Sequence, residues 1–421
     1  MQIRANPRPK PKISIQYLQD SPDLADRSIK DVRERLRIAG DKLPLSEVLI
    51  GWQVPPSMLK ACRQEAERLD ATLYRWHPLL ASDGVFYPRP EWRVIGLNGE
   101  PLTGFQNMPD FTFVCPNRPQ VRAAVMERLE NLIADGAYEG LFLDRMRFPS
   151  PAADPLGDLG CFCPSCHQAA ARQGLDLARI RATLQAWGQS AAGKRDLVRA
   201  LLQPLEGAPD SPQAGALKSF LRFRCESVSG LVRLAAERLQ AARMPVGLDC
   251  FSPALMPLVG QDNAALAACA DWVKLMCYAH TLGPAGLPFE LLALADWLVE
   301  RAGLDGPGAL ELLSQATGLP LPADRGALRV GGLSSGALRV EVGRGVAASS
   351  APCLFGVELM EMEGVVSLDP VQIRGDLSAV REVGPGGLAL SWDLWDMPLG
   401  RLDLVREVWL EGGSEQECDG R

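Results

Sequence analysis

The chain has 421 residues, 47% of them hydrophobic and 23% charged, a composition typical of globular proteins that bury a large core. Its net charge of −7 and the absence of an 18-residue apolar run argue against a nucleic-acid partner and against a membrane span. The basic, proline-broken N-terminus lacks the apolar stretch of a secretory signal, so we expect the cytoplasm as its location.

Residues 1–44 are expected to form an N-terminal arm and a helix that begins near Ser28 and ends near Gly40. After this helix, short apolar runs alternate with amphipathic helical segments. Because strands that alternate with helices form parallel βαβ units, eight such runs predict a closed (β/α)₈ TIM barrel over 45–410. The predicted strands are 48–52, 73–76, 111–115, 140–143, 246–248, 272–277, 353–357 and 388–392.

An open, doubly wound sheet is the alternative architecture. Folds of that kind usually carry a glycine-rich phosphate-binding turn after the first strand. Here the first predicted strand runs into GWQVPPSML, which has no such turn, so nucleotide binding is not favoured.

Two long insertions interrupt the alternation, 150–216 after the predicted fourth strand and 281–351 after the sixth. Both follow the carboxyl end of a strand, and that end of a barrel carries the catalytic groups of TIM-barrel enzymes. We therefore expect both insertions to cover the same face of the barrel. A short C-terminal tail, 411–421, is expected to follow.

Carboxylates follow several predicted strands. Asp144 comes directly after the apolar run GLFL, and burying it unpaired would be too costly, so it either pairs with an arginine or faces a cleft. Glycoside hydrolysis needs two carboxylates roughly 5–10 Å apart, and strands four and seven face each other across a barrel mouth. Asp144 and Glu358 are therefore predicted as the catalytic pair, with Asp249 as the alternative partner.

Other side chains near the strand ends are candidates for binding a sugar. Polar groups can bind its hydroxyls, and an aromatic ring can stack on its apolar face, although the same rings also pack well in a core. The predicted substrate-binding residues are Asp249, Arg147, Tyr278, Trp52, His77 and Asp393.

Eleven cysteines are present, and most lie within apolar runs, as small buried side chains in a reducing compartment do. Cys161, Cys163 and Cys166 instead show the spacing C-x-C-x-x-C, and Cys115 ends the predicted neighbouring strand. Four thiolates form a closed, structural Zn²⁺ site, with His167 as the alternative fourth ligand. Buried free thiols, a disulfide or a redox-active thiol are the other interpretations.

These four cysteines resemble the zinc cluster of glycoside hydrolase family 42 β-galactosidases, TIM barrels with one catalytic carboxylate on strand four and another on strand seven. The segment GLFLDRMRFP is also similar to the L-D-x-x-R-F/Y-P segment that ends strand four in bacterial glycoside-hydrolase-like barrels. The chain departs from family 42, whose strand four ends in Asn-Glu, because here the strand ends in Leu143 and Asp144.

The resemblance implies a TIM-barrel glycoside hydrolase that acts on a carbohydrate and holds a structural zinc. By the strand roles of family 42, Glu358 would be the nucleophile and Asp144 the acid/base, while a strand-four Asp nucleophile would reverse these roles. A non-catalytic barrel that binds carbohydrate and holds a structural zinc is the competing prediction. The sequence predicts no oligomeric state.

Overall fold

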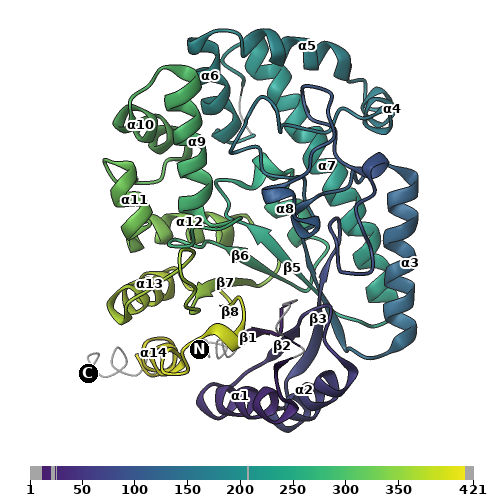
Figure 1. The fold of residues 1–421 in the computed structure, drawn as a ribbon, viewed down its shortest axis with the longest axis vertical. Coiled ribbons are helices and arrows are strands. Elements are labelled where there is room, and N and C mark those ends of the chain that lie inside the picture. The colour runs from purple at the N-terminus through teal and green to yellow at the C-terminus, as the bar shows by residue number, and fades with distance from the viewer. Residues whose placement is uncertain (1–11, 20–23, 25, 206–207, 413–421) are drawn as a thin grey trace, which may run out of the picture.

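The computed structural model describes residues 12–19, 24, 26–205 and 208–412, and within them eight parallel strands close into a barrel (Figure 1). The strands pair in sequence order, and β1 also pairs with β8 to close the barrel. The predicted (β/α)₈ architecture is therefore confirmed. The strands are β1 (Lys12–Tyr17), β2 (Glu47–Ile50), β3 (Thr72–Pro78), β4 (Gly140–Asp144), β5 (Val246–Phe251), β6 (Trp272–Met276), β7 (Cys353–Glu358) and β8 (Gly387–Ser391).

Apolar residues dominate the strands because helices cover the outer face and side chains fill the inner face of the barrel. Alternate residues point inward and form a compact aromatic cluster. Phe142 and Trp272 stack there with their ring centroids 5.1 Å apart. A Cβ atom at Gly247 would lie only 2.3 Å from the Trp272 ring, so this strand position needs glycine. The inward-facing cluster consists of Leu49, Trp52, Tyr74, Trp76, Phe142, Trp272, Leu354 and Ala389.

Two details of the predicted strand assignment are wrong. The first barrel strand is β1, which lies in the segment predicted as an N-terminal arm; residues 1–11 of that arm lie outside the described residues. The predicted strand 111–115 is not part of the barrel, because Val114 forms only an isolated bridge with Arg93. The stretch 79–118 is instead a long connection between β3 and α3.

Eight helices of the described segments follow the strands, and several begin with a side-chain cap: the Ser28 side chain, for example, accepts a hydrogen bond from the Asp31 N–H. These helices are α1 (Ile29–Lys42), α2 (Pro56–Leu69), α3 (Pro119–Asp135), α7 (Pro212–Ala241), α8 (Asn263–Ala267), α12 (Ser335–Ala348), α13 (Pro370–Val383) and α14 (Arg401–Val405). Short helical turns are η2 (Pro90–Trp92), η3 (Phe105–Asn107), η4 (Pro109–Phe111), η5 (Met256–Val259), η6 (Leu394–Asp396) and η7 (Arg406–Glu411).

The two insertions add further helices and pack against each other. In Figure 1 they occupy the upper part of the molecule, away from α1 and α2. Arg195 on α6 donates a 2.7 Å hydrogen bond to the carbonyl of Ala302 on α9, so the insertions after β4 and β6 meet. The added helices are α4 (Pro164–Arg172), α5 (Leu177–Trp187), α6 (Ala191–Leu202), α9 (Leu287–Ala302), α10 (Gly306–Thr317) and α11 (Arg325–Gly331).

Of the tail predicted at 411–421, residues 413–421 lie outside the described residues. Among the helices of the described segments, none combines the length and the apolar character that crossing a bilayer requires.

Candidate active site and metal centre

Four cysteine side chains converge beside the barrel, Cys115 from the connection after β3 and the other three from the insertion after β4. All four are buried, and their sulfur atoms lie within 4.8 Å of one another. The sulfur of Cys115 is 3.4 Å from that of Cys166 and 3.6 Å from that of Cys163. Four thiolates held tetrahedrally at about 2.3 Å from Zn²⁺ would lie roughly 3.8 Å apart, so the cluster has suitable dimensions for a metal ion.

N–H groups surround these sulfur atoms. The Ile95 backbone N–H donates to Cys161 at 3.3 Å, and Asn117 donates from its backbone to Cys115 and from its side chain to Cys166, both at 3.4 Å. Such donors stabilise metal-bound thiolates and fix their orientation. Burial raises the pKa of the Cys115 thiol, a preference that a bound cation would reverse.

The surroundings of Arg224 on α7 indicate that the cysteine cluster fits a metal ion. It is fully buried, and its Nη1 donates to the Leu258 carbonyl at 2.8 Å, while Nε and Nη2 have no hydrogen-bond partner among the described residues. Burial lowers its pKa to about 10, whereas negative charge on Cys225, Cys161 and Cys166 would raise it. No described carboxylate pairs with this cation, so a metal tetrathiolate with a charge of −2 is a fitting counterion.

The alternative ligand, His167, is half-buried on α4 and does not belong to the converging group. The ten cysteines in the described part of the chain form no disulfide, and all of them are buried. A redox-active thiol would need an exposed sulfur, so the geometry favours the interpretation as a metal site.

Asp144 ends β4 and lies on the inner side of the barrel wall, two residues after Phe142. The Trp76 indole N–H donates to its Oδ2 at 2.9 Å, and the Arg145 backbone N–H donates to its Oδ1 at 2.5 Å. The Arg145 Nε is 3.9 Å from Oδ2, and the Asp144 side chain keeps 10% of its surface exposed. Asp144 is thus held by fixed donors while remaining accessible.

Asp249 on β5 lies beside Asp144. The register of β4 and β5 pairs Leu143 with Leu248, so the next residues, Asp144 and Asp249, stand at the same level on neighbouring strands. Asp249 is buried, and Lys274 donates to its Oδ2 at 3.0 Å, while Oδ1 has no partner among the described residues.

The electrostatic surroundings of Asp249 favour its protonated form. Burial raises the pKa of Asp249 to about 7; Lys274 opposes this rise, and the negative charge of Asp144 adds to it. Lys274 also donates to the Gln16 side chain at 2.8 Å, which fixes the ammonium group inside the barrel. The carboxylates on β4 and β5 are therefore neighbours in different environments.

Glu358 ends β7 and belongs to another hydrogen-bond network. It accepts from the backbone N–H groups of Ala279 at 2.8 Å and His280 at 3.2 Å, and from the Thr281 hydroxyl at 2.5 Å. These bonds tie β7 to the segment that follows β6. No hydrogen bond or ion pair among the described residues joins Glu358 to Asp144.

Two predicted sugar-binding aromatics lie near the carboxylates. Trp52 packs edge-to-face on Trp76 with ring centroids 5.4 Å apart, and the guanidinium carbon of Arg145 lies 4.8 Å from its ring. The Tyr278 ring centroid is 5.3 Å from the Lys274 ammonium nitrogen. Both rings therefore border the acidic centre of the barrel.

Two other predicted binding residues have different partners. Asp393 accepts from the backbone N–H groups of Leu18 and Gln19 at 3.0 and 2.9 Å, and so links the end of β1 to the turn after β8. His77 is buried, with its Nδ1 4.0 Å from the carboxylate of Asp83, and burial keeps its pKa well below the usual range. As a neighbour of the inward-facing Trp76, His77 faces the outside of the barrel wall.

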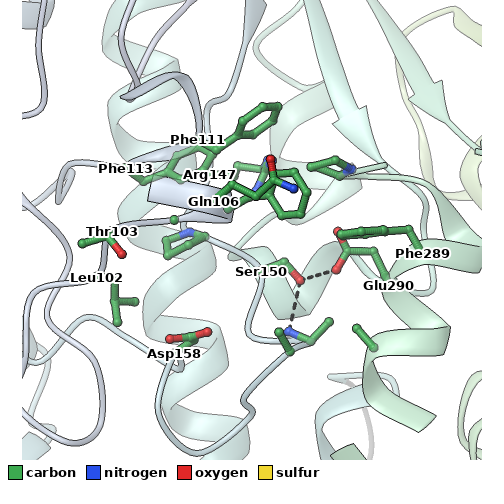
Figure 2. A pocket seen from close by; sticks show the side chains of 17 residues that line it. Leu102, Thr103, Gln106, Phe111, Phe113, Arg147, Ser150, Asp158, Phe289 and Glu290 are labelled. Carbon is green, nitrogen blue, oxygen red and sulfur yellow. Dashed lines mark hydrogen bonds between the residues drawn. The ribbon is translucent and has the colours of Figure 1, made fainter. Parts of the chain in front are cut away.

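Arg147, the remaining predicted residue, lines a cavity of about 330 Å³ between the segments that follow β3, β4 and β6 (Figure 2). Its guanidinium carbon lies 4.4 Å from the ring centroid of Phe113 and 4.6 Å from that of Phe251. Glu290 of α9 lines the same cavity and accepts a 2.5 Å hydrogen bond from the Ser150 hydroxyl.

Sequence reasoning missed Lys274 and Glu290. Lys274 had a visible signal, because a lone charge in the apolar run WVKLM must find a partner inside the barrel. Glu290 lies in an insertion, where no periodic pattern points to its neighbours.

No protein-family model matches the chain, and no curated protein matches it. Among solved structures, the PgaB (BpsB) glycoside hydrolase domain from Bordetella bronchiseptica is 13% identical with a TM-score of 0.53, over 96% of this chain and 98% of that one. A GH42 β-galactosidase from G. stearothermophilus is 11% identical with a TM-score of 0.50, over 90% of this chain and 51% of that one.

The chain thus spans about half of the β-galactosidase and nearly all of the PgaB domain. At these identities the likeness concerns the fold. The predicted resemblance to the TIM barrels of glycoside hydrolases is confirmed at that level.

Proposed function

We propose that the chain is a glycoside hydrolase in which Asp144 is the nucleophile and Asp249 the acid/base. The observation that carries this proposal is the placement of both carboxylates at the same level on β4 and β5. Neighbouring strands are about 4.8 Å apart, close to the 5–5.5 Å between the carboxyl groups of retaining glycosidases.

The surroundings of each carboxylate suit its role. Trp76 and Arg145 hold the Asp144 carboxylate in a fixed orientation for attack on the anomeric carbon. Asp249, with its pKa raised to about 7 by burial, is partly protonated at neutral pH and can give this proton to the leaving oxygen. After the glycosyl–enzyme forms, Asp249 takes a proton from water, and the hydroxide equivalent releases the sugar.

The sequence predicted Glu358 as the partner of Asp144. The hydrogen bonds from Ala279, His280 and Thr281 engage both of its oxygen atoms, which supports a role in positioning the segment after β6. We therefore favour Asp249 as the second carboxylate and keep Glu358 as the alternative that the experiment below separates.

Trp52 and Tyr278, at the edge of the acidic centre, support a carbohydrate as the substrate because their rings can stack on a sugar. Zn²⁺ in the cysteine cluster would join the connections after β3 and β4, and so hold in place the loop that begins at Asp144. Ten buried, unpaired cysteines also fit the predicted cytoplasmic location.

A panel of aryl glycosides tests this proposal, with kcat/KM compared among the unmodified chain, Asp144→Asn, Asp249→Asn and Glu358→Gln. We expect the two aspartate variants to lose at least about a hundredfold in kcat/KM, since each removes a group that acts in the transition state. Glu358→Gln keeps one acceptor oxygen for the N–H groups of Ala279 and His280, and its new NH2 group can donate to the Thr281 hydroxyl, so it should retain most activity.

If Glu358→Gln loses as much kcat/KM as Asp144→Asn while Asp249→Asn stays active, the catalytic pair is instead Asp144 on β4 and Glu358 on β7. If the unmodified chain hydrolyses none of the panel but binds sugars, the non-catalytic carbohydrate-binding barrel is the better account.

A further inference from the structure

The cavity beside the acidic centre has apolar walls that come from three separate segments. Phe105 packs edge-to-face against Phe111 and Phe289, with ring centroids 6.0 and 5.5 Å apart. Phe105 and Phe111 belong to the connection after β3, and Phe289 belongs to α9 after β6. All three rings line the cavity and are only half-buried, so part of their surface is open to it, as a binding site for the C–H face of a sugar requires.

Polar groups that line the same cavity have hydrogen-bond donors and acceptors that are not used within the described residues. Arg147 is 5% exposed, and among the described residues its five N–H groups form one hydrogen bond, to the Phe148 carbonyl at 3.3 Å. Glu290 uses its two oxygens to accept from Ser150 at 2.5 Å and from the Ala285 N–H at 3.1 Å, and each oxygen has a further lone pair. Figure 2 shows Arg147 near the Phe111 and Phe113 rings, and the Ser150–Glu290 pair beyond it.

The charges around the cavity favour a neutral ligand. No carboxylate in the described residues lies within ion-pair distance of Arg147, yet the charges of Glu290 and Asp144 act on it. Asp158, which also lines the cavity, is a third acidic residue near it. An anionic ligand would meet these acids and a cationic ligand would meet Arg147, whereas hydroxyl groups can accept from Arg147 and donate to Glu290.

The cavity adjoins the proposed catalytic centre through Arg145. The guanidinium carbon of this residue lies 4.9 Å from the Phe111 ring, which lines the cavity, and its Nε lies 3.9 Å from the Asp144 carboxylate. A cavity of about 330 Å³ is at the lower end of the range for ligand sites, roughly 300–1,000 Å³, and suits a single sugar ring.

We infer that this cavity binds a neutral pyranose, a sugar unit of the substrate that adjoins the bond to be cleaved. Its phenyl rings bind the apolar face of the sugar, while Arg147 and Glu290 bind adjacent hydroxyls. This place of the sugar in the substrate rests on the proposed hydrolase function, but binding in the cavity does not depend on turnover.

Filling the cavity from α9 tests this inference. Ala293→Phe places a ring in the cavity, and Val299→Phe places the same ring on the same helix at a half-buried residue outside the cavity. Both variants are made in the Asp144→Asn chain, and thermal unfolding confirms that each is folded. Saturation-transfer NMR then measures binding of the methyl β-pyranosides of glucose, galactose and N-acetylglucosamine, with methyl glucuronide as the anionic probe.

We expect at least one neutral pyranoside to bind, with a dissociation constant that rises at least about tenfold in Ala293→Phe and stays unchanged in Val299→Phe. Equal affinity in Ala293→Phe, tighter binding of the glucuronide, or no binding of any neutral probe would overturn the inference.

The two proposals fail separately. If the unmodified chain hydrolyses aryl glycosides but Ala293→Phe binds every probe normally, the sugar site is wrong and the hydrolase stands. If Ala293→Phe abolishes sugar binding but Asp144→Asn leaves turnover unchanged, the sugar site stands and the catalytic assignment is wrong.

Discussion

Replacing Cys163 with serine should release the metal ion and destabilise the chain. The substitution removes one of the four sulfur atoms that we propose bind zinc, and without the metal the buried Arg224 would lose its counterion. Leaving one member of a buried charge pair alone costs about 3–5 kcal/mol, and a structural zinc site adds to this because its binding energy contributes to folding.

This free energy translates into a measurable change in melting temperature. Globular proteins gain about 2.1 cal/mol/K of entropy per residue on unfolding, which for 421 residues gives roughly 0.9 kcal/mol/K. A loss of about 3–5 kcal/mol therefore lowers Tm by roughly 3–6 °C. Differential scanning calorimetry measures this shift, and mass spectrometry of the metal content measures the zinc bound to each chain.

Cys62→Ser is the matched control, because Cys62 is also fully buried but lies on α2, outside the cluster. It should keep its zinc and lose only the roughly 1 kcal/mol that burying a hydroxyl costs, about 1 °C in Tm. The reasoning is refuted if Cys163→Ser keeps its metal and has the same Tm as Cys62→Ser. It is also refuted if the unmodified chain binds no metal when it is produced with zinc present.

Arg224→Met keeps the side-chain length but removes the charge beside the sulfurs, so a chelator should extract the metal at least about tenfold faster, and an unchanged rate would contradict this role. Because burial raises the pKa of Asp249 to about 7, a pH series should show kcat/KM falling as pH rises above about 7; a constant kcat/KM there would exclude Asp249 as the acid. Burial lowers the pKa of His280, but its hydrogen bond to Asp376 and the negative charges of Glu358 and Asp376 raise it above the ordinary value overall, so these contacts add stability below about pH 6.5 that is lost as pH rises through the folded-state pKa. Asp376→Asn should reduce this pH dependence of Tm, and an unaltered dependence would count against the role of the His280–Asp376 pair.

The barrel could be predicted from the sequence because most of its strands are buried on both faces and read as continuous apolar runs. The sequence did not predict β1, because its inward positions hold Ser14 and Gln16, which interrupt the apolar run. These polar groups have buried partners: Ser14 donates to Glu47 at 2.7 Å, and Gln16 accepts from Lys274. The residues that hid the strand are thus part of the polar barrel interior.

The cysteine cluster could be predicted because three of its members are close in sequence. Its fourth member, Cys115, was placed by a strand that does not exist, but it still belongs to the connection after β3, next to β4. Cys115 still lies near the other three cysteines, because consecutive strands of a barrel are neighbours whatever the conformation of the loops between them.

The choice between partners for Asp144 could not be made from the sequence. Glu358 and Asp249 both end or nearly end a strand, and their roles depend on which groups donate to them. The donors to Glu358 lie in the loop after β6, and the sequence does not reveal that loop's conformation. The cavity was hidden for the same reason, because Phe105 and Phe289 meet only in the folded chain.

Covalent labelling of the nucleophile tests the central claim most directly. The chain is incubated with the 2-deoxy-2-fluoro analogue of an aryl glycoside that it hydrolyses, which slows release of the glycosyl–enzyme, and the labelled peptide is found by mass spectrometry. We predict one fluorosugar per chain, attached to Asp144 and absent from Asp144→Asn. A label on Glu358 or on another residue, or turnover of the analogue without any label, would contradict Asp144 as the nucleophile.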